Sequence, residues 1–491
     1  MENAQPESFL LQLPAELIQN ILSFLPAASL GLLASSCSLL HQHTLNELHW
    51  CAQVQQCIPG TRLSKAYPAE SFRALYKSHH PFLFLPKHKI WFSDTAHTGK
   101  LLIARYSHSR QTIEAYALAA ERGASRFEFW AWNKDVIIHS FEPNVQLDLN
   151  RPIIQITPDE SWTRGRNIYA EDIPMFNTRG PGFPIGNGMS SVFMHTRPLP
   201  VAAIGPATQV WPPQTLPAMS RTRNSSGVSF RQVGHRPTKF SEISDSTFRI
   251  VNRVNYNTHL VGVRRVGEHV DTYATLPPES YTPTKAKPYR GIWVGDYSGH
   301  GCEFLAVLQP DIPQKLPDGA LEAIEHNKRS VSPGSEASWR TALSSLENDD
   351  DSHSDMFEHS PTADDSLPAV DAKEVVSNRA NKENMDIVEH TGQIMAIKLT
   401  GDPNVPRGEY TFIAPDISDN GLLRVAREEI FQDARIVRSV GHIAARGFRE
   451  DGYIPSQLIL VSHDTLAQYW EEFGHISFYK RVDIDSFLHA D

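Results

Sequence analysis

The chain has 491 residues, of which 40% are apolar and 9% aromatic, so it is long enough for a large core domain with further segments attached. Its net charge of −10 is uneven, because residues 311–390 hold 18 acidic and 7 basic residues and leave 38 acidic against 39 basic residues elsewhere. Outside that segment the chain is nearly neutral and has no concentrated basic field, so we expect no nucleic-acid partner.

The sequence contains no stretch that is long and apolar enough to span a membrane. Glu2 and Glu7 stand where a signal peptide has basic residues, and Pro14 and Glu16 break the apolar run that follows. We therefore expect no membrane partner and a location in the cytoplasm, the nucleus or both.

The cysteines indicate neither a disulfide framework nor a metal site. They form no C-x-x-C pair, although three of them lie near the N-terminus among scattered histidines. We expect no metal site and no cofactor. The cysteines are Cys37, Cys51, Cys57 and Cys302.

The segment from Phe9 to about Gly60 has the periodicity of helices. Pro14 can begin a helix at its first turn, Pro26 ends it, and Ser29 is the expected N-cap of a second short helix. A third helix follows over residues 39–48. Because about fifty residues bury too little surface to be stable alone, the apolar stripe of the first helix needs either a partner or the large domain to pack on. That stripe comprises Leu17, Ile18, Ile21, Leu22 and Leu25.

After about Ser71 the period of the apolar residues changes to 2, which predicts strands. Many short strands separated by Gly, Pro and Asn turns favour an antiparallel barrel, in which closure removes the exposed edges. Near the end of the chain, Glu471 and Glu472 are assigned to an amphipathic helix beside Trp470. The predicted strands include "KLLIARYS", "RFEFWAWN", "VIIHSF", "NVQLDLN", "PIIQI", "FRIVNRV", "GIWVGDY", "EFLAVLQ", "QIMAIKLT" and "SQLILVS".

Two segments interrupt the strand pattern. Residues 198–239 are rich in Pro, Arg, Ser and Gln, which predicts a flexible loop. Residues 310–390 contain two aromatic residues, the acidic run "ENDDD" and Ser-rich flanks, which predicts a disordered insertion. This insertion also carries Ser332-Pro333, Ser360-Pro361 and a KEN sequence at 382–384, which are candidate regulatory sites.

The N-terminal stretch "LPAELIQNILSFLPAASLGLLASSCSLLHQHTLNELHW" resembles the F-box. The resemblance lies in Leu-Pro-x-Glu-Leu, a hydrophobic pair, a second Leu-Pro and a Leu-rich helix. In F-box proteins these helices dock onto the Skp-type adaptor of a cullin-RING ubiquitin ligase, with apolar anchors in a groove. The resemblance implies adaptor contacts from Leu13, Pro14, Leu17, Ile21, Leu22, Leu25 and Leu33.

Three later stretches, taken with the F-box, resemble the F-box-only cyclin-D-binding family. They are "GIWVGDYSGHGCEFLAVLQ", "IKLTGDPNVPRGEYTF" and the block from "GHIAARGFREDGY" to "HISFYKRVD". This family joins an F-box to a β-rich domain that captures short, often C-terminal, peptide segments, and D-type cyclins are its named substrate. The resemblance implies a non-catalytic substrate-recognition subunit of an SCF-type ubiquitin ligase that binds a degron peptide.

Two turns in these stretches offer polar groups to such a peptide. If they converge, Lys398 and free backbone N–H groups can receive a carboxyl or amide terminus, and Asp402 can accept N–H donors. The same residues are also ordinary turn residues, and Asp402 can instead cap its own turn. The substrate-binding candidates are Asp296, Tyr297, His300, Lys398, Thr400, Asp402 and Asn404.

We therefore predict an α+β chain in which a three-helix F-box at 8–60 precedes a mainly antiparallel β-barrel. The barrel takes its first part from 71–309 and its last part from 391–491. The alternative function is a β-barrel enzyme or small-ligand-binding protein with a helical lid. We expect no catalysis, because His300 and Cys302 have no preset hydrogen bond and Cys302 begins an apolar run.

Overall fold

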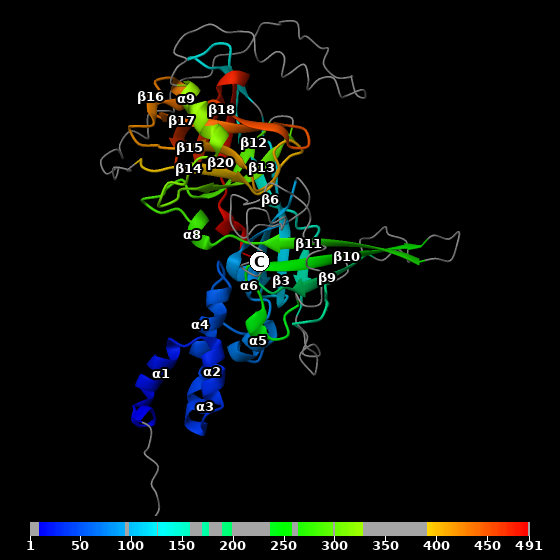
Figure 1. The fold of residues 1–491 in the computed structure, drawn as a ribbon. Helices are drawn as coiled ribbons and strands as arrows, with labels where there is room; N and C mark the ends of the chain where they lie inside the picture. Colours follow the sequence, from blue (N-terminus) through cyan, green and yellow to red (C-terminus); the bar gives the residue numbers. More distant parts are fainter. Residues whose placement is uncertain are drawn as a thin grey trace, which may run out of the picture.

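The computed structural model describes residues 9–93, 98–124, 126–157, 169–175, 189–198, 236–257, 264–297, 300–327 and 390–489. Helices near the N-terminus, a first sheet and a β-barrel follow one another along the molecule, with the barrel and the N-terminal helices at opposite ends (Figure 1). The helices among these residues are all too short or too polar to cross a membrane. Most of the loop expected at 198–239 and the candidate regulatory sites at 332–384 lie outside the described residues.

The N-terminal segment forms four short α-helices and a 3₁₀ turn, where three helices were expected. Pro26 is the N-cap of the second helix, so Ser29 lies inside it and the expected Ser29 cap is wrong. The expected third helix is divided because the Asn46 side chain accepts a hydrogen bond from Leu48 N at 3.0 Å and begins a new helix. The elements are η1 (Phe9–Gln12), α1 (Ala15–Ser23), α2 (Ala27–Ala34), α3 (Ser38–Thr44) and α4 (Glu47–Cys57).

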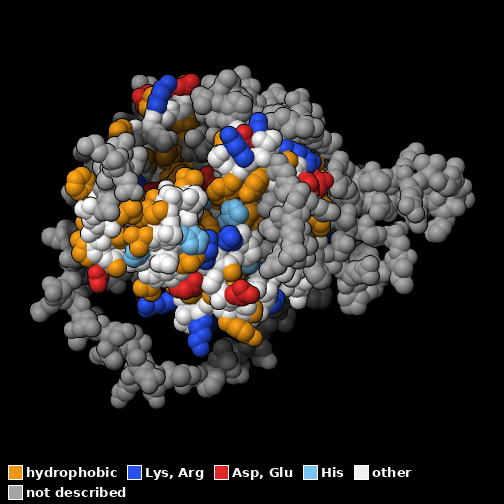
Figure 2. Space-filling view, turned by 90° about the horizontal axis from the view of Figure 1, so that it is seen from below, with side chains coloured by type: hydrophobic (Ala, Val, Ile, Leu, Met, Phe, Trp, Pro, Cys, Tyr) orange, Lys and Arg blue, Asp and Glu red, His pale blue; other side chains and the backbone are white. Residues whose placement is uncertain are grey.

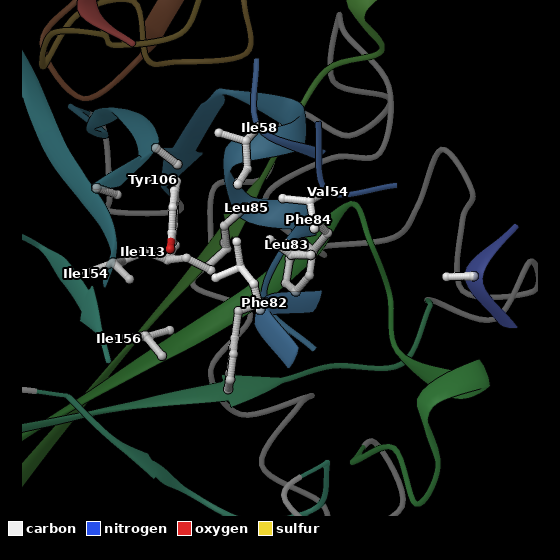
Figure 3. Close-up of a cluster of buried hydrophobic side chains, with 14 of the residues drawn as sticks. Val54, Ile58, Phe82, Leu83, Phe84, Leu85, Tyr106, Ile113, Ile154 and Ile156 are labelled. Atoms are coloured by element: carbon white, nitrogen blue, oxygen red, sulfur yellow. The ribbon is translucent and has the colours of Figure 1, made fainter. Parts of the chain in front are cut away.

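Helices α5 (Phe72–His79) and α6 (Phe84–His88) join these helices to the first sheet. Glu47 at the start of α4 accepts a hydrogen bond from Phe72 N at 2.7 Å, which fixes α5 against α4. Apolar side chains of α4 and of the α5–α6 segment then pack on one face of the sheet in a single core (Figure 3). This core includes Val54, Ile58, Phe82, Leu83, Phe84, Leu85, Tyr106, Ile113, Ile154 and Ile156.

The first sheet is antiparallel and separate from the barrel, with strand order β6-β3-β2-β1-β11-β10-β9-β8 and β7 paired to β3. We expected strands from residue 71 onward to form the first part of the barrel, and the structure differs. A period of 2 predicts a strand but does not identify the strand that it pairs with. The strands are β1 (Ile90–Ser93), β2 (Leu101–Ser107), β3 (Thr112–Glu121), β6 (Asn144–Leu147), β7 (Ile154–Ile156), β8 (Ile173–Pro174), β9 (Met189–His195), β10 (Thr247–Asn257) and β11 (Arg264–Ala274).

The predicted antiparallel barrel is confirmed, but it begins at Gly291. Its strand order is β15-β14-β13-β12-β20-β19-β18-β17, and the pairing of Phe412 with Gly441 closes β15 onto β17. A ninth strand, β16, pairs with β17 outside the ring. The strands are β12 (Gly291–Asp296), β13 (Cys302–Leu308), β14 (Ile394–Lys398), β15 (Tyr410–Ala414), β16 (Leu422–Val425), β17 (Arg435–Ala445), β18 (Arg449–Ser462), β19 (Thr465–Trp470) and β20 (His475–Arg481).

The helix expected around Glu471 and Glu472 is absent from this described region. Strand β19 ends at Trp470, a 3₁₀ turn η7 (Glu471–Phe473) follows, and Gly474 with φ of +58° leads into β20. The left-handed conformation of Gly474 reverses the chain and lets β20 pair back on β19. The apolar spacing that suggested a helix therefore belongs to a hairpin.

The barrel wall is covered on two sides. Outward side chains of β12, β13, β19 and β20 pack against the first sheet and a small hairpin, β4 (Phe127–Phe129) and β5 (Ile137–His139). Helix α9 (Asp318–Asn327) covers β17 and β18, with Ala320 and Ala323 buried. The expected disorder of residues 310–390 is thus wrong for 310–327, because an apolar stripe there packs on the barrel. Residues 328–389 lie outside the described part of the chain.

The C-terminal segment ties the barrel back to the linker helices. After β20, η8 (Ile484–Phe487) brings Asp485 to 2.7 Å from Lys89 Nζ. Leu488 is 2% exposed and lies against Gly60, where a Cβ would come within 2.7 Å of the Leu488 Cβ. Gly60 also has φ of +87°, so this contact depends on glycine.

We expect Leu488→Ala to lower the free energy of unfolding by about 2–4 kcal/mol, because it leaves a cavity beside Gly60. Leu321→Ala on α9 is the control, since Leu321 is 50% exposed. Chemical denaturation followed by tryptophan fluorescence measures both variants. Equal effects of the two substitutions would show that the C-terminal segment does not stabilise the linker.

Candidate functional site

Helix α1 carries two neighbouring apolar stripes, one buried and one exposed. Ile18 and Leu22 are 2% exposed and pack in the core with half-buried Leu25, whereas Leu17 and Ile21 are 49% and 42% exposed. Phe24 extends the outer stripe at i, i+4 and i+7 from Leu17, which is one helix face. In the sequence the two stripes form one apolar pattern, and only their packing separates them.

An exposed apolar face therefore remains on the N-terminal helices. Figure 2 views the molecule from the end where these helices lie and shows hydrophobic side chains grouped on that surface. Phe24, Leu32 and Leu48 are 81%, 73% and 75% exposed. The sequence analysis did not name these three, although the i, i+4, i+7 spacing from Leu17 was a signal for Phe24. We call the set Leu17, Ile21, Phe24, Leu32 and Leu48 the outer apolar face.

The seven predicted adaptor contacts fall into three groups. Pro14, Leu17 and Ile21 are exposed, and Leu13, Leu25 and Leu33 are half-buried. Leu22 is buried in the core and does not reach the surface, so its assignment as an adaptor contact is wrong. Its spacing four residues after Ile18 places it on the inner stripe.

Polar contacts hold the helices of the outer apolar face in one arrangement. Gln19 on α1 donates to the backbone oxygen of His43 at 3.2 Å and accepts from the Asn46 amide at 2.8 Å. His49 Nε2 lies 2.5 Å from the same Gln19 oxygen. These bonds join α1 to α3 and α4, so the face is formed before any partner arrives.

Four hairpin connections meet at one end of the barrel, which we call the hairpin end. They join β12 to β13, β14 to β15, β17 to β18 and β19 to β20. Gly447 N donates to Pro403 O at 2.8 Å, which links the β17–β18 turn to the β14–β15 turn. Phe304 N donates to Thr400 Oγ1 at 2.8 Å, which links that turn to β13. The two turns considered in the sequence thus lie side by side.

A buried charged cluster lies beneath these turns. Lys398 Nζ is 2.6 Å from Asp402 Oδ2 and 2.8 Å from Glu303 Oε2, and all three side chains are at most 6% exposed. The Tyr297 ring lies 4.3 Å from Lys398 Nζ, in cation–π geometry. The Tyr297 hydroxyl is 2.6 Å from Thr411 Oγ1. Sequence reasoning considered Glu303 only as part of a catalytic group, although a carboxylate inside an apolar strand is itself a signal.

The backbone N–H groups expected to receive a peptide terminus are used within the turn. Asp402 Oδ1 accepts from Asn404 N at 2.6 Å and Val405 N at 2.8 Å, so Asp402 caps its own turn. Gly401 N donates to Thr98 O at 2.8 Å. The groups of this turn that face outward are therefore side chains rather than backbone amides.

The remaining substrate-binding candidates differ in exposure. His300 is exposed and Asn404 is half-buried. Asp296 is largely buried and forms an ion pair with Arg122 at the end of β3. The adjacent η7 turn contributes Phe473, which is 48% exposed. The hairpin end thus presents a histidine, an amide and an aromatic ring above the buried charges.

Burial and neighbouring charges set the proton affinities in the cluster. Burial raises the pKa of Glu303 to about 8, against the opposing charge of Lys398 and with the support of the Asp402 charge. Burial also opposes ionisation of Asp402, but the ammonium and hydrogen bond of Lys398 outweigh it and lower the Asp402 pKa. At neutral pH Glu303 is therefore mainly protonated, and the Lys398–Asp402 pair is nearly neutral as a unit.

The barrel interior beside the cluster is polar and close-packed. Ser456 Oγ lies 2.7 Å from Ser439 Oγ and accepts from Gln468 Nε2 at 3.0 Å, and Tyr479 donates to Gln468 Oε1 at 3.1 Å. A Cβ at Gly441 would lie 2.1 Å from the Trp470 ring, which crosses that strand. Among the described residues, no three His, Cys, Asp or Glu side chains are placed to hold a metal ion.

Comparison with protein-family models matches this architecture in two places. A model of the F-box domain matches residues 10–51, which are the helices that carry the outer apolar face. A model of the cyclin D1 binding domain matches residues 273–486, which span the barrel and α9.

The chain is an F-box protein with a cyclin D1 binding domain. In this F-box protein, the cyclin D1 binding domain coincides with the barrel, and the first sheet lies almost entirely outside both matches. A comparison with curated proteins finds no match to the chain. The two matches agree with the resemblance drawn from the sequence.

The buried carboxyl predicts a pH dependence of stability. The pKa of Glu303 in the folded protein, about 8, lies above its ordinary value of 4.5, so the folded state binds more protons between these values. The contribution of Glu303 protonation to the free energy of unfolding is fully present below pH 4.5 and is lost as the pH rises towards 8. Glu303→Gln removes this proton, and we expect thermal denaturation to show a smaller fall in melting temperature from pH 5 to 8 than in the unmodified chain.

Asp402 does not obscure this measurement, because its lowered pKa affects stability only in acid below its ordinary value of 3.8. The histidines are the same in the unmodified chain and in Glu303→Gln, so their contribution to the pH dependence cancels in the comparison. Identical pH profiles of the two proteins would contradict the assignment of a buried, protonated Glu303.

Proposed function

We propose that this F-box protein is the substrate-recognition subunit of an SCF-type ubiquitin ligase, binding a Skp-type adaptor through the F-box and a protein client through the barrel. The observation that carries the proposal is the outer apolar face. Soluble proteins bury such grouped side chains against a partner, and Leu17, Ile21 and Phe24 form a helix stripe of the kind that docks in a groove.

The linker supports a role in positioning a client. The F-box helices share a core with α5, α6 and the first sheet, and the opposite face of that sheet packs on the barrel. A client held at the hairpin end is therefore held at a defined place relative to the adaptor. Such a receptor raises the rate of ubiquitin transfer by proximity and orientation.

The client contacts the hairpin end in this proposal. His300, Asn404 and Phe473 present outward groups, whereas Lys398 and Asp402 neutralise each other and hold the turn. An uncharged or weakly polar peptide segment suits this surface, because the charges beneath it are buried and paired with each other. The match to the cyclin D1 binding domain supports a D-type cyclin as one such client.

The runner-up is a barrel enzyme or ligand-binding protein for which the helices are a lid. In the described chain the helices that carry the exposed outer apolar face lie at the opposite end of the molecule from the barrel (Figure 1). A lid over the barrel requires the reverse arrangement. This geometry favours the receptor.

We expect Leu17→Asp with Ile21→Asp to abolish capture of a purified Skp-type adaptor in a pull-down, because two charges would be buried in the interface. The thermal midpoint should change little, since both residues are exposed. Leu321→Asp on α9 is the matched control and should bind normally. Adaptor binding by the double variant would contradict the F-box assignment.

We expect His300→Ala with Asn404→Ala to weaken binding of a purified D-type cyclin about tenfold, through the loss of one or two hydrogen bonds. The control is His463→Ala with Asn420→Ala, which changes the same residue types at exposed positions at the opposite barrel end. Calorimetry or biolayer interferometry gives both affinities. An equal loss in the two variants would exclude the hairpin end as the client site.

A further inference from the structure

Strand β4 is an unusually exposed edge, and its side away from β5 pairs with none of the described strands. It pairs only with β5 among the described strands, and Phe127 and Phe129 are 70% and 65% exposed. Its three residues are all exposed, although the next residue, Trp130, is fully buried against Tyr469 and Phe431. Natural proteins protect such edges with charges or cover them with another chain, because an open apolar edge invites strand pairing.

The register of the hairpin shows which main-chain groups of β4 are available. Ser140 N donates to Arg126 O at 2.7 Å and Trp130 N donates to Val136 O at 2.9 Å. The main-chain groups of residues 126 and 130 therefore point toward β5. Phe127 pairs with His139 and Phe129 with Ile137 at the intervening positions. By the alternation of antiparallel ladders, the N–H and C=O groups of Phe127 and Phe129 point away from β5.

Two charges of opposite sign flank Phe127 on this edge. Arg126 and Glu128 are exposed, and neither side chain has an ion-pair partner among the described residues. We propose that β4 is a homodimer interface, at which β4 pairs antiparallel with β4 of a second copy of this chain about a two-fold axis at Phe127.

This register pairs the opposite charges and also gives the outward main-chain groups of β4 hydrogen-bond partners. With Phe127 opposite Phe127 of the partner subunit, the outward N–H of each Phe127 donates to the outward C=O of the other. The two residues then form a hydrogen-bonded pair of the antiparallel ladder. Arg126 of each copy then lies opposite Glu128 of the partner subunit, in the pairing where side chains approach most closely. A register centred on Glu128 instead places two like charges opposite each other, which is unfavourable.

The proposed dimer leaves the rest of the molecule accessible. The hairpin packs on the barrel, and the F-box helices lie at the far end of the molecule (Figure 1). Two copies joined at β4 therefore carry two free outer apolar faces, and each copy contributes its own barrel. A client with two binding segments gains avidity from such an arrangement.

Sedimentation velocity and light scattering on the full chain over a range of concentrations test this proposal. We expect a concentration-dependent dimer that Arg126→Glu alone and Glu128→Arg alone each weaken about tenfold, because each creates two like-charge pairs. The double variant Arg126→Glu with Glu128→Arg restores opposite charges and should dimerise like the unmodified chain. Glu142→Arg changes an exposed charge outside β4 and should have no effect.

Phe127→Pro gives an independent test, because it removes an N–H that points to the second copy and spares the β4–β5 bonds. We expect it to abolish the dimer without a change in thermal midpoint. A chain that stays monomeric at all concentrations overturns the proposal. A dimer that survives both single charge changes, or a double variant that folds normally and does not regain the dimer, overturns it as well.

Discussion

The burial of the linker helices against the first sheet is the constraint on which the arrangement of this molecule depends. Leu85 and Trp91 are completely buried there, and each such side chain contributes about 1.5–3 kcal/mol by leaving water. Because Val54 and Ile58 enter the same cluster, the F-box helices share a core with the sheet instead of hanging from a flexible tether. The other face of the sheet packs on the barrel, so two continuous hydrophobic clusters connect the F-box helices to the barrel.

The division of α1 into two stripes follows from that constraint. Ile18 and Leu22 supply the inner contact that stabilises the helix bundle. Leu17 and Ile21 remain exposed because only one side of α1 packs against the other helices. The Gln19 contacts lie on the packed side of α1, beside the inner stripe, and hold α1 to α3 and α4 through hydrogen bonds. An apolar surface can stay exposed in this way without unfolding the helices, and it is ready to bind a partner with little further ordering cost.

The hairpin end of the barrel combines a buried ion pair with an outer layer of histidine, amide and aromatic side chains. Lys398 and Asp402 make the β14–β15 turn a fixed structure, and the Glu303 carboxyl contacts Lys398 from the neighbouring strand. Removing one partner of such a group leaves an uncompensated buried charge, so the cluster constrains the turn strongly even if its net contribution to stability is small. The side chains that face outward at this end, such as His300 and Asn404, are thus different from Lys398 and Asp402, which hold the turn.

The sequence by itself determined the features that depend on near neighbours along the chain. The order of residues around Leu13–Leu33 and the turns near Gly401 identified the F-box and the cyclin D1 binding domain, and the period of 2 located the barrel strands at Gly291, Cys302 and Ile394. Tertiary structure alone decided which stripe of α1 faces outward, and that β15 closes onto β17 through Phe412 and Gly441. It also separated the first sheet from the barrel, placed Glu303 beside Lys398, and turned the expected helix at Glu471 into a hairpin. These outcomes depend on contacts between residues far apart in sequence, which periodicity and turn chemistry do not encode.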